Sequence, residues 1–194
     1  MTAIHTCIPQ DVQTPEQAAQ YREAKRQAEI QSLRSGQTYQ PAYILIPDLT
    51  MEDLPGTTWR NLWTADPHTI TTIGPDRFGK IGPDPTSYAT FCIGYWTADQ
   101  FQIRDWVRVD NLPAHTQIAW AIQHVRHCKM QLHATHKQNE HTGKKTRGTF
   151  TRFREEDVQQ ALDQLRQLTK QHGAPLTNPV AIALPGEQLT LSFI

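Results

Sequence analysis

The spacing of apolar residues predicts a first helix that begins at Thr14 and ends at Gly36. Residues 14–17 (Thr-Pro-Glu-Gln) have the composition of a capping box with proline at the first helical position. Small or apolar residues then recur at helical spacing: Ala18, Tyr21, Ala24, Ala28 and Leu33. A face made mostly of alanine packs closely but buries little area, so we expect this helix on the surface or against a partner.

Two longer helical patterns follow in the second half of the chain. The first runs from residue 112 to about residue 137, with Asp110 or Asn111 as its cap. The second runs from residue 155 to residue 171, with acidic residues in its first turn and Gly173 after its end. The apolar stripes are Ile118, Ile122, Val125 and Leu132 on the first, and Val158, Ala161, Leu162, Leu165 and Leu168 on the second.

Shorter apolar runs predict strands. Residues 42–46 form a fully apolar run between two prolines, which is typical of a buried strand. Residues 88–96 and 101–109, with Ala98-Asp99-Gln100 as the turn between them, predict an antiparallel hairpin. Residues 180–184 and 189–194 flank a Pro-Gly turn and predict a second hairpin.

Residues 101–109 alternate between two faces. The polar face carries Arg104, Trp106 and Arg108, which form either a contact surface or a face that packs on a helix with its arginines in ion pairs. Trp59 and Trp63 stand four residues apart in a stretch rich in turn residues, and this spacing predicts one helical turn that docks both indoles into the core.

These elements predict an α+β protein of one domain, residues 1–194, with antiparallel hairpins, an N-terminal helix, a long central helix, and a C-terminal helix followed by a hairpin. We expect residues 1–13 to be flexible and residues 138–149 to form a mobile basic loop. The longest apolar runs hold about five residues where about 20 are needed to span a membrane. Three widely spaced cysteines and no visible signal peptide favour the cytoplasm.

The charge of the chain is zero only because segments of opposite sign cancel. Residues 1–120 carry nine basic and thirteen acidic side chains, and residues 155–194 carry two basic and five acidic. Residues 121–154 carry eight basic and one acidic side chain, a net charge of +7. Local charge determines the local field, so this segment is the candidate contact for a polyanion.

Within this segment, cations stand beside aromatic rings. We expect the basic side chains of the long helix to lie opposite its apolar stripe and to continue into the basic loop. Phosphates attract such cations and bases stack on such rings, although phenylalanines at the end of a loop are more often core anchors. The candidate nucleic-acid-binding residues are Arg126, Lys129, Lys137, Lys144, Lys145, Arg147, Phe150, Arg152 and Arg154.

Histidines raise two further hypotheses. His124, His127 and Cys128 can converge on one side of a helix, but no Cys-x-x-Cys pair accompanies them, so solvated histidines are the simpler interpretation and we expect no metal or cofactor. His133 and His136 could serve acid–base catalysis of nucleic-acid cleavage. No carboxylate cluster, nucleophile motif or phosphate loop accompanies them.

The sequence therefore favours a non-enzymatic accessory protein that binds single-stranded RNA or DNA, as a subunit of a ribonucleoprotein or mobile-element complex. One alternative is an adaptor or inhibitor that docks its basic loop on an acidic protein partner. The other is a histidine-dependent nuclease or phosphodiesterase. The charge pattern alone leaves RNA and DNA equally open as ligands.

Overall fold

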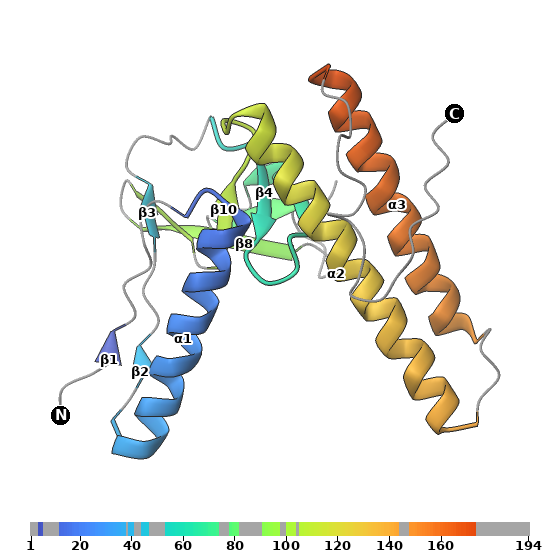
Figure 1. Cartoon of the computed structure of the whole chain (residues 1–194). Coiled ribbons are helices and arrows are strands. Elements are labelled where there is room, and N and C mark those ends of the chain that lie inside the picture. The colour runs from blue at the N-terminus through green and yellow to red at the C-terminus, as the bar shows by residue number, and fades with distance from the viewer. Residues whose placement is uncertain are drawn as a thin grey trace. The chain divides into compact units, whose positions relative to one another are not determined.

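The computed structural model of the chain describes ten stretches of backbone (Figure 1): residues 4–5, 12–37, 39–40, 44–46, 53–73, 78–81, 91–97, 100–103, 105–143 and 148–173. Side chains are described in 12–37, 53–71, 105–143 and 148–173. The chain divides into two compact units, Met1–Leu112 and Pro113–Ile194, and each is described by itself. That the two units form one domain stays a prediction.

The first unit contains the helix α1 (Pro15–Ser35), whose ends confirm the prediction. The Gln17 amide N–H donates to Thr14 Oγ1 at 3.3 Å, and the Thr14 amide N–H donates to Gln17 Oε1 at 2.9 Å, which is a complete capping box. Gly36 ends the helix in the left-handed conformation, with φ of 67°. The buried face stops at Lys25, and Leu33 is 86% exposed, so the second half of the predicted apolar face is not buried.

The first unit contains a two-stranded sheet and a five-stranded sheet, and the five-stranded sheet includes the predicted hairpin. A five-stranded antiparallel sheet has the order β3-β9-β8-β7-β6, and β1 and β2 form a parallel pair. The pairing of β8 with β9 confirms an antiparallel hairpin in the predicted place. The strands are β1 (Ile4–His5), β2 (Tyr39–Gln40), β3 (Ile44–Ile46), β6 (Thr72–Ile73), β7 (Phe78–Ile81), β8 (Phe91–Thr97) and β9 (Gln100–Ile103).

A separate three-stranded antiparallel sheet corrects the prediction of one strand over residues 101–109. Its order is β10 (Trp106–Arg108), β4 (Thr58–Asn61), β5 (Pro67–Thr69). The backbone turns at Asp105, whose φ is 63°, so the chain leaves the larger sheet after β9 and pairs with β4 instead. The alternation of polar and apolar residues continues across Asp105, and so the sequence pattern did not indicate the break between the two strands.

The two tryptophans of the same region are also placed differently from the prediction. Trp59 lies in β4, paired with both neighbouring strands, and is 1% exposed. Trp63 lies in the turn after β4 and is 45% exposed. The helical turn expected from their spacing does not form, because the strand pairing of residues 58–61 determines the local backbone. Among the residues of this unit whose side chains the structure describes, the buried apolar ones include Val12, Ala18, Tyr21, Leu54, Trp59, Leu62, Ala65, Ile70, Trp106, Val107 and Val109.

A buried arginine, Arg60, lies in β4, the central strand of the three-stranded sheet. Arg60 donates through Nη1 to the Ala65 carbonyl at 2.6 Å, and burial lowers the pKa of its guanidinium to about 10, an effect that the charge of Asp66 partly offsets. Ala65 has a φ of 58°. The guanidinium thus provides a hydrogen-bond donor for the Ala65 carbonyl, which lies in the tight turn after β4 and outside the strand pairing.

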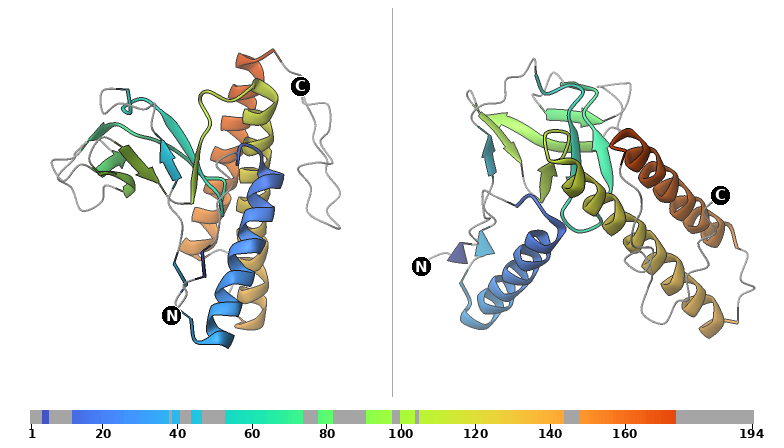
Figure 2. Two further views of the ribbon diagram at one scale, coloured as in Figure 1. Left: turned by 90° about the vertical axis from the view of Figure 1, so that its left-hand side faces the viewer. Right: turned by 45° about the horizontal axis from the view of Figure 1, so that its top comes forward.

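The second unit is built on two antiparallel helices, α2 (Ala114–His141) and α3 (Thr149–Gln171), which lie side by side in both views of Figure 2. Between them lies a buried cluster of Ala121, Val125, Cys128, Ala161 and Leu165. The partly buried residues packed against this cluster are Ile118, Ile122, Val158, Leu162 and Leu168. Eight of these ten residues belong to the two predicted stripes. Ala121 and Cys128 were not predicted, and the predicted Leu132 is not in the cluster.

Three predictions about this hairpin need correction. Helix α2 begins at Pro113 without a side-chain cap, because Asp110 instead binds Arg108 and accepts from the Thr58 amide N–H. Helix α2 continues to His141, so residues 138–141 are helical rather than loop. Helix α3 begins at Thr149, before the acidic residues that we expected in its first turn.

The described elements confirm an α+β fold that is mostly helical. The predicted C-terminal hairpin lies outside the described residues. In the part of the chain that the structure describes, no helix combines the length and the apolarity needed to cross a membrane.

Candidate nucleic-acid interface

The end of the helical hairpin is organised by one hydrogen bond between its two helices. Asn139 Nδ2 donates to Thr151 Oγ1 at 3.0 Å, and Thr151 is buried. Because α2 and α3 run in opposite directions, residues that precede Asn139 on α2 lie beside residues that follow Thr151 on α3. Lys137 lies at the level of Phe153, at the end of the hairpin that carries the first turns of α3.

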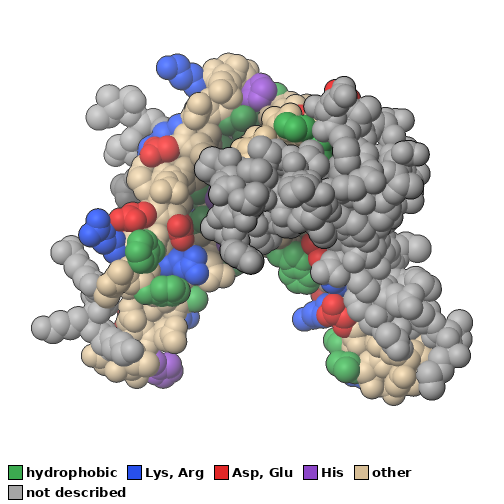
Figure 3. Space-filling model, turned by 180° about the vertical axis from the view of Figure 1, so that it is seen from behind, with side chains coloured by type: hydrophobic (Ala, Val, Ile, Leu, Met, Phe, Trp, Pro, Cys, Tyr) green, Lys and Arg blue, Asp and Glu red, His purple; other side chains and the backbone are tan. Residues whose placement is uncertain are grey.

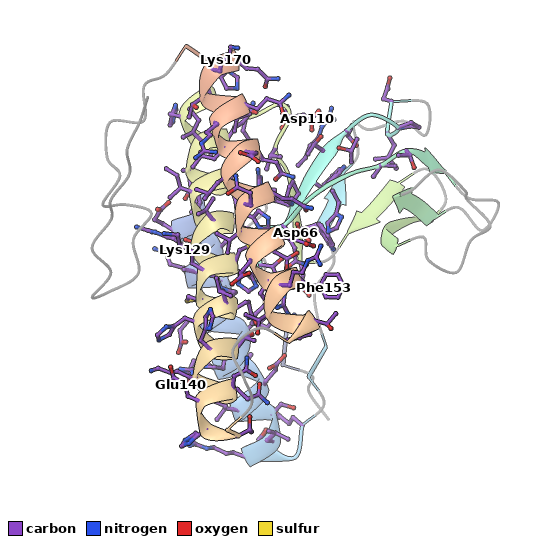
Figure 4. All side chains as sticks on the ribbon, turned by 90° about the vertical axis from the view of Figure 1, so that its right-hand side faces the viewer. Asp66, Asp110, Lys129, Glu140, Phe153 and Lys170 are labelled. Atoms are coloured by element: carbon purple, nitrogen blue, oxygen red, sulfur yellow. The ribbon has the colours of Figure 1, made fainter. Side chains whose placement is uncertain are left out.

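Two phenylalanines of the first turns of α3 are exposed. Phe150 is 61% exposed and Phe153 is 57% exposed. Figure 4 shows Phe153 projecting outward from α3, at the opposite end of the helix from Lys170. The two rings are not the core anchors that residues of this type usually are. Both rings follow the basic loop beside arginines in the sequence, but only Phe150 was named there as a binding residue.

An arginine accompanies the first of these rings. The Cζ atom of Arg154 lies 5.2 Å from the centroid of the Phe150 ring, within the range of a cation–π contact. The same guanidinium donates from Nη1 to Asp157 Oδ2 at 3.1 Å. Phe150 and Arg154 stand four residues apart, and so they are neighbours on the surface of the helix.

The second arginine at this end also has an acidic neighbour. Arg152 donates from Nε to Glu156 Oε1 at 2.9 Å, and its side chain is 79% exposed. Ion pairs this exposed are worth roughly 0 to 1 kcal/mol, so a phosphate can compete for either arginine. Figure 3 shows charges of both signs and exposed hydrophobic groups along the helical hairpin, on the face turned to the viewer.

The remaining candidates lie in three places. Arg126 and Lys129 are half-buried on α2, so they lie beside the apolar stripe rather than opposite it, and they stand about three to four turns before the end of the helix. Lys137 is exposed near the hairpin end. The residues Lys144, Lys145 and Arg147 fall outside the described residues, in the sequence between α2 and α3.

The start of α3 adds to the positive field at this end. Its N-cap is Gly148, which has no side chain to accept a hydrogen bond, and its first turn contains no acidic residue. Unsatisfied amide N–H groups at a helix start carry a partial positive charge. This charge has the same sign as Arg152 and Arg154.

Comparisons were made with protein-family models, curated proteins and solved structures. None matches this chain significantly.

The histidines of α2 form no group of metal ligands among the described residues. Cys128 Sγ lies 3.8 Å from His124 Nε2, with the cysteine buried in the interface between α2 and α3. His133 is exposed and His136 is half-buried, and no described carboxylate contacts either of them.

The second surface suggested by the sequence is largely buried. Trp106 is 5% exposed and meets the ring of His68 edge-on, with 5.0 Å between the ring centroids. Arg108 donates to the Asp110 carboxylate from Nη2 at 2.8 Å and from Nε at 3.0 and 3.1 Å. Arg104 lies outside the described residues. The ion pair of Arg108 agrees with the second of the two interpretations, but the ring that Trp106 meets belongs to strand β5 and not to a helix.

Proposed function

We propose that the protein is a non-enzymatic accessory protein that binds single-stranded nucleic acid at the end of the α2–α3 hairpin. The observation that carries this proposal is the concentration of charge: residues 121–154 hold a net charge of +7 in a chain whose total is zero. Two of the eight cations in this segment, Arg152 and Arg154, lie in the first turns of α3, where two phenylalanine rings are exposed. Phosphate contact releases counterions, which is the main source of affinity for a polyanion.

The distribution of charge favours a contact within residues 121–154. Residues 1–120 have a net charge of −4 and residues 155–194 a net charge of −3, so both repel phosphates. Along the sequence, the acidic residues of α3 begin directly after the basic segment, at Glu155. We therefore expect a short binding site rather than a long groove.

The test is a titration of a fluorescent single-stranded oligonucleotide across a range of salt concentrations. Affinity should fall steeply with salt, and K144A/K145A/R147A should lower the slope of log Kd against log salt by about 2, because each phosphate contact on a single strand contributes about 0.7. The control R34A/R166A/K170A removes the same charge elsewhere, and it should leave the slope nearly unchanged. No binding by the wild-type protein at low salt would refute the proposal.

The same titration separates the two alternatives. An adaptor that docks on an acidic protein would retain its partner after nuclease treatment and would not bind the oligonucleotide. A nuclease would cleave the oligonucleotide, and changing His133 or His136 to alanine would abolish cleavage. The proposal expects intact oligonucleotide on a gel after the titration.

A further inference from the structure

We infer that Phe150 and Phe153 are a stacking platform for the bases of a single strand. This inference rests on the proposed function and adds to it, because it assigns recognition of unpaired bases to two side chains that carry no charge. It implies that the ligand is single-stranded and not duplex, since the bases of a duplex are already stacked on each other.

The placement of the two rings suits consecutive bases. Residues three apart on a helix are separated by about 4.5 Å along the axis and by about 60° around it, so their side chains share one side of the helix. Both lie in the first turns of α3, before the apolar stripe that packs against α2. Neither ring is needed to complete the core of the hairpin.

The contact with Arg154 prepares the first ring for this role. The guanidinium lies near the Phe150 ring, 5.2 Å from its centroid, and Asp157 binds the same guanidinium. A ring held in this way loses little freedom when a base stacks on it, and a cation stands next to the phosphate that follows the base. A single-stranded nucleic acid offers both groups in alternation.

The charge of the segment that contains the rings favours a single-stranded nucleic acid over an apolar protein surface as the ligand. Two exposed phenylalanines also fit a hydrophobic partner, but the segment that contains them has one acidic residue against eight basic ones. An exposed aromatic ring with a cation against it, at the end of a basic segment, suits the binding of a single strand, which needs charge for its phosphates and a ring for its bases.

The experiment compares three ligands of equal length: a single-stranded oligothymidylate, the same backbone without bases, and a duplex. The abasic strand carries the same charge and lacks only the stacking groups. The wild-type protein should bind the base-bearing strand roughly fivefold or more tightly than the abasic strand. F150A/F153A should remove this difference and leave the salt slope unchanged.

Two variants control for the loss of apolar area. F150L/F153L keeps the hydrophobic bulk without the aromatic face, so it should behave as the alanine variant does, whereas a protein-binding surface would tolerate leucine. M130A removes an exposed apolar side chain from α2, outside the platform, and it should bind as the wild type does. Circular dichroism should show an unchanged helix content in all three variants.

The outcomes separate the two proposals. If the wild-type protein binds abasic and base-bearing strands equally, the stacking inference is wrong and the phosphate-binding proposal stands. If it binds none of the three ligands at low salt, both are wrong. If F150L/F153L retains the full preference for bases, the rings do not stack and the inference is overturned.

Discussion

Lys25 Nζ lies 2.9 Å from Asp105 Oδ2, with both side chains nearly buried. The Tyr21 hydroxyl donates to the other carboxylate oxygen of Asp105 at 2.8 Å, and the Asp105 carbonyl accepts from the Leu62 amide N–H at 2.9 Å. Asp105 is also the residue of positive φ at which the chain passes from β9 to β10. One residue therefore ties α1, the turn after β4 and the junction of two sheets.

The ion pair between Lys25 and Asp105 predicts that the two side chains contribute to stability in a strongly coupled way. D105N or K25M alone should lower the free energy of unfolding by about 3 kcal/mol, because each removes one of two opposite charges that are nearly buried together. The double variant K25M/D105N should lose less than the sum of the two, since neither charge remains. Asparagine tolerates the left-handed backbone at position 105, so D105N adds no conformational strain. Urea denaturation followed by tryptophan fluorescence measures all three, and additive losses would contradict the coupling.

How far the sequence predicts the fold depends on how local each signal is. The ends of α1 are determined by Thr14 and Gly36, which act within one turn, and both were identified from the residues alone. The strand β4 is determined by pairing with β5 and with β10, which follows it by more than forty residues. The helical spacing of Trp59 and Trp63 was a weaker influence than that pairing. The break at Asp105 likewise depends on Lys25 and Tyr21, far away in the sequence.

The candidate site divides in the same way. Charge composition, a property of the sequence, singled out residues 121–154. The pairing of α2 with α3 determines which of these residues lie at the hairpin end. Arg152 and Arg154 lie there, whereas Arg126 and Lys129 lie farther back on α2. The exposure of Phe150 and Phe153 follows from the early start of α3 at Thr149, whereas the apolar stripe indicated a start at residue 155.

The bond between Asn139 and Thr151 predicts a link between stability and binding at the hairpin end. T151V keeps the shape of the side chain but removes the acceptor for the Asn139 amide, so it should lower the free energy of unfolding by about 1 kcal/mol. It should also weaken oligonucleotide binding, because it loosens the end at which the rings are presented. T151S retains the hydroxyl group and is the matched control. Equal stability of T151V and T151S in urea would show that the bond contributes nothing.

The core of the hairpin predicts a large effect at Leu165. This side chain is 1% exposed in the cluster with Val125 and Cys128, so L165A should lower the free energy of unfolding by roughly 2 to 5 kcal/mol. L33A makes the same substitution at an exposed position and should change stability little. Thermal denaturation followed by circular dichroism measures both. Similar melting temperatures for the two variants would show that α3 does not depend on this packing.

The ion pairs at the hairpin end predict opposite effects of two double variants on binding. R152Q/R154Q removes two cations, so it should weaken oligonucleotide binding and lower the salt slope by about 1.4, at about 0.7 for each contact. E156Q/D157N removes the carboxylates that compete with phosphate for the same arginines, so it should tighten binding. Both changes are at the surface, where exposed pairs contribute roughly 0 to 1 kcal/mol, so neither should unfold the hairpin. Affinity measured across salt concentrations distinguishes them. Weaker binding by E156Q/D157N would mean that the carboxylates hold the arginines in the orientation that phosphate requires, and that they do not compete with it.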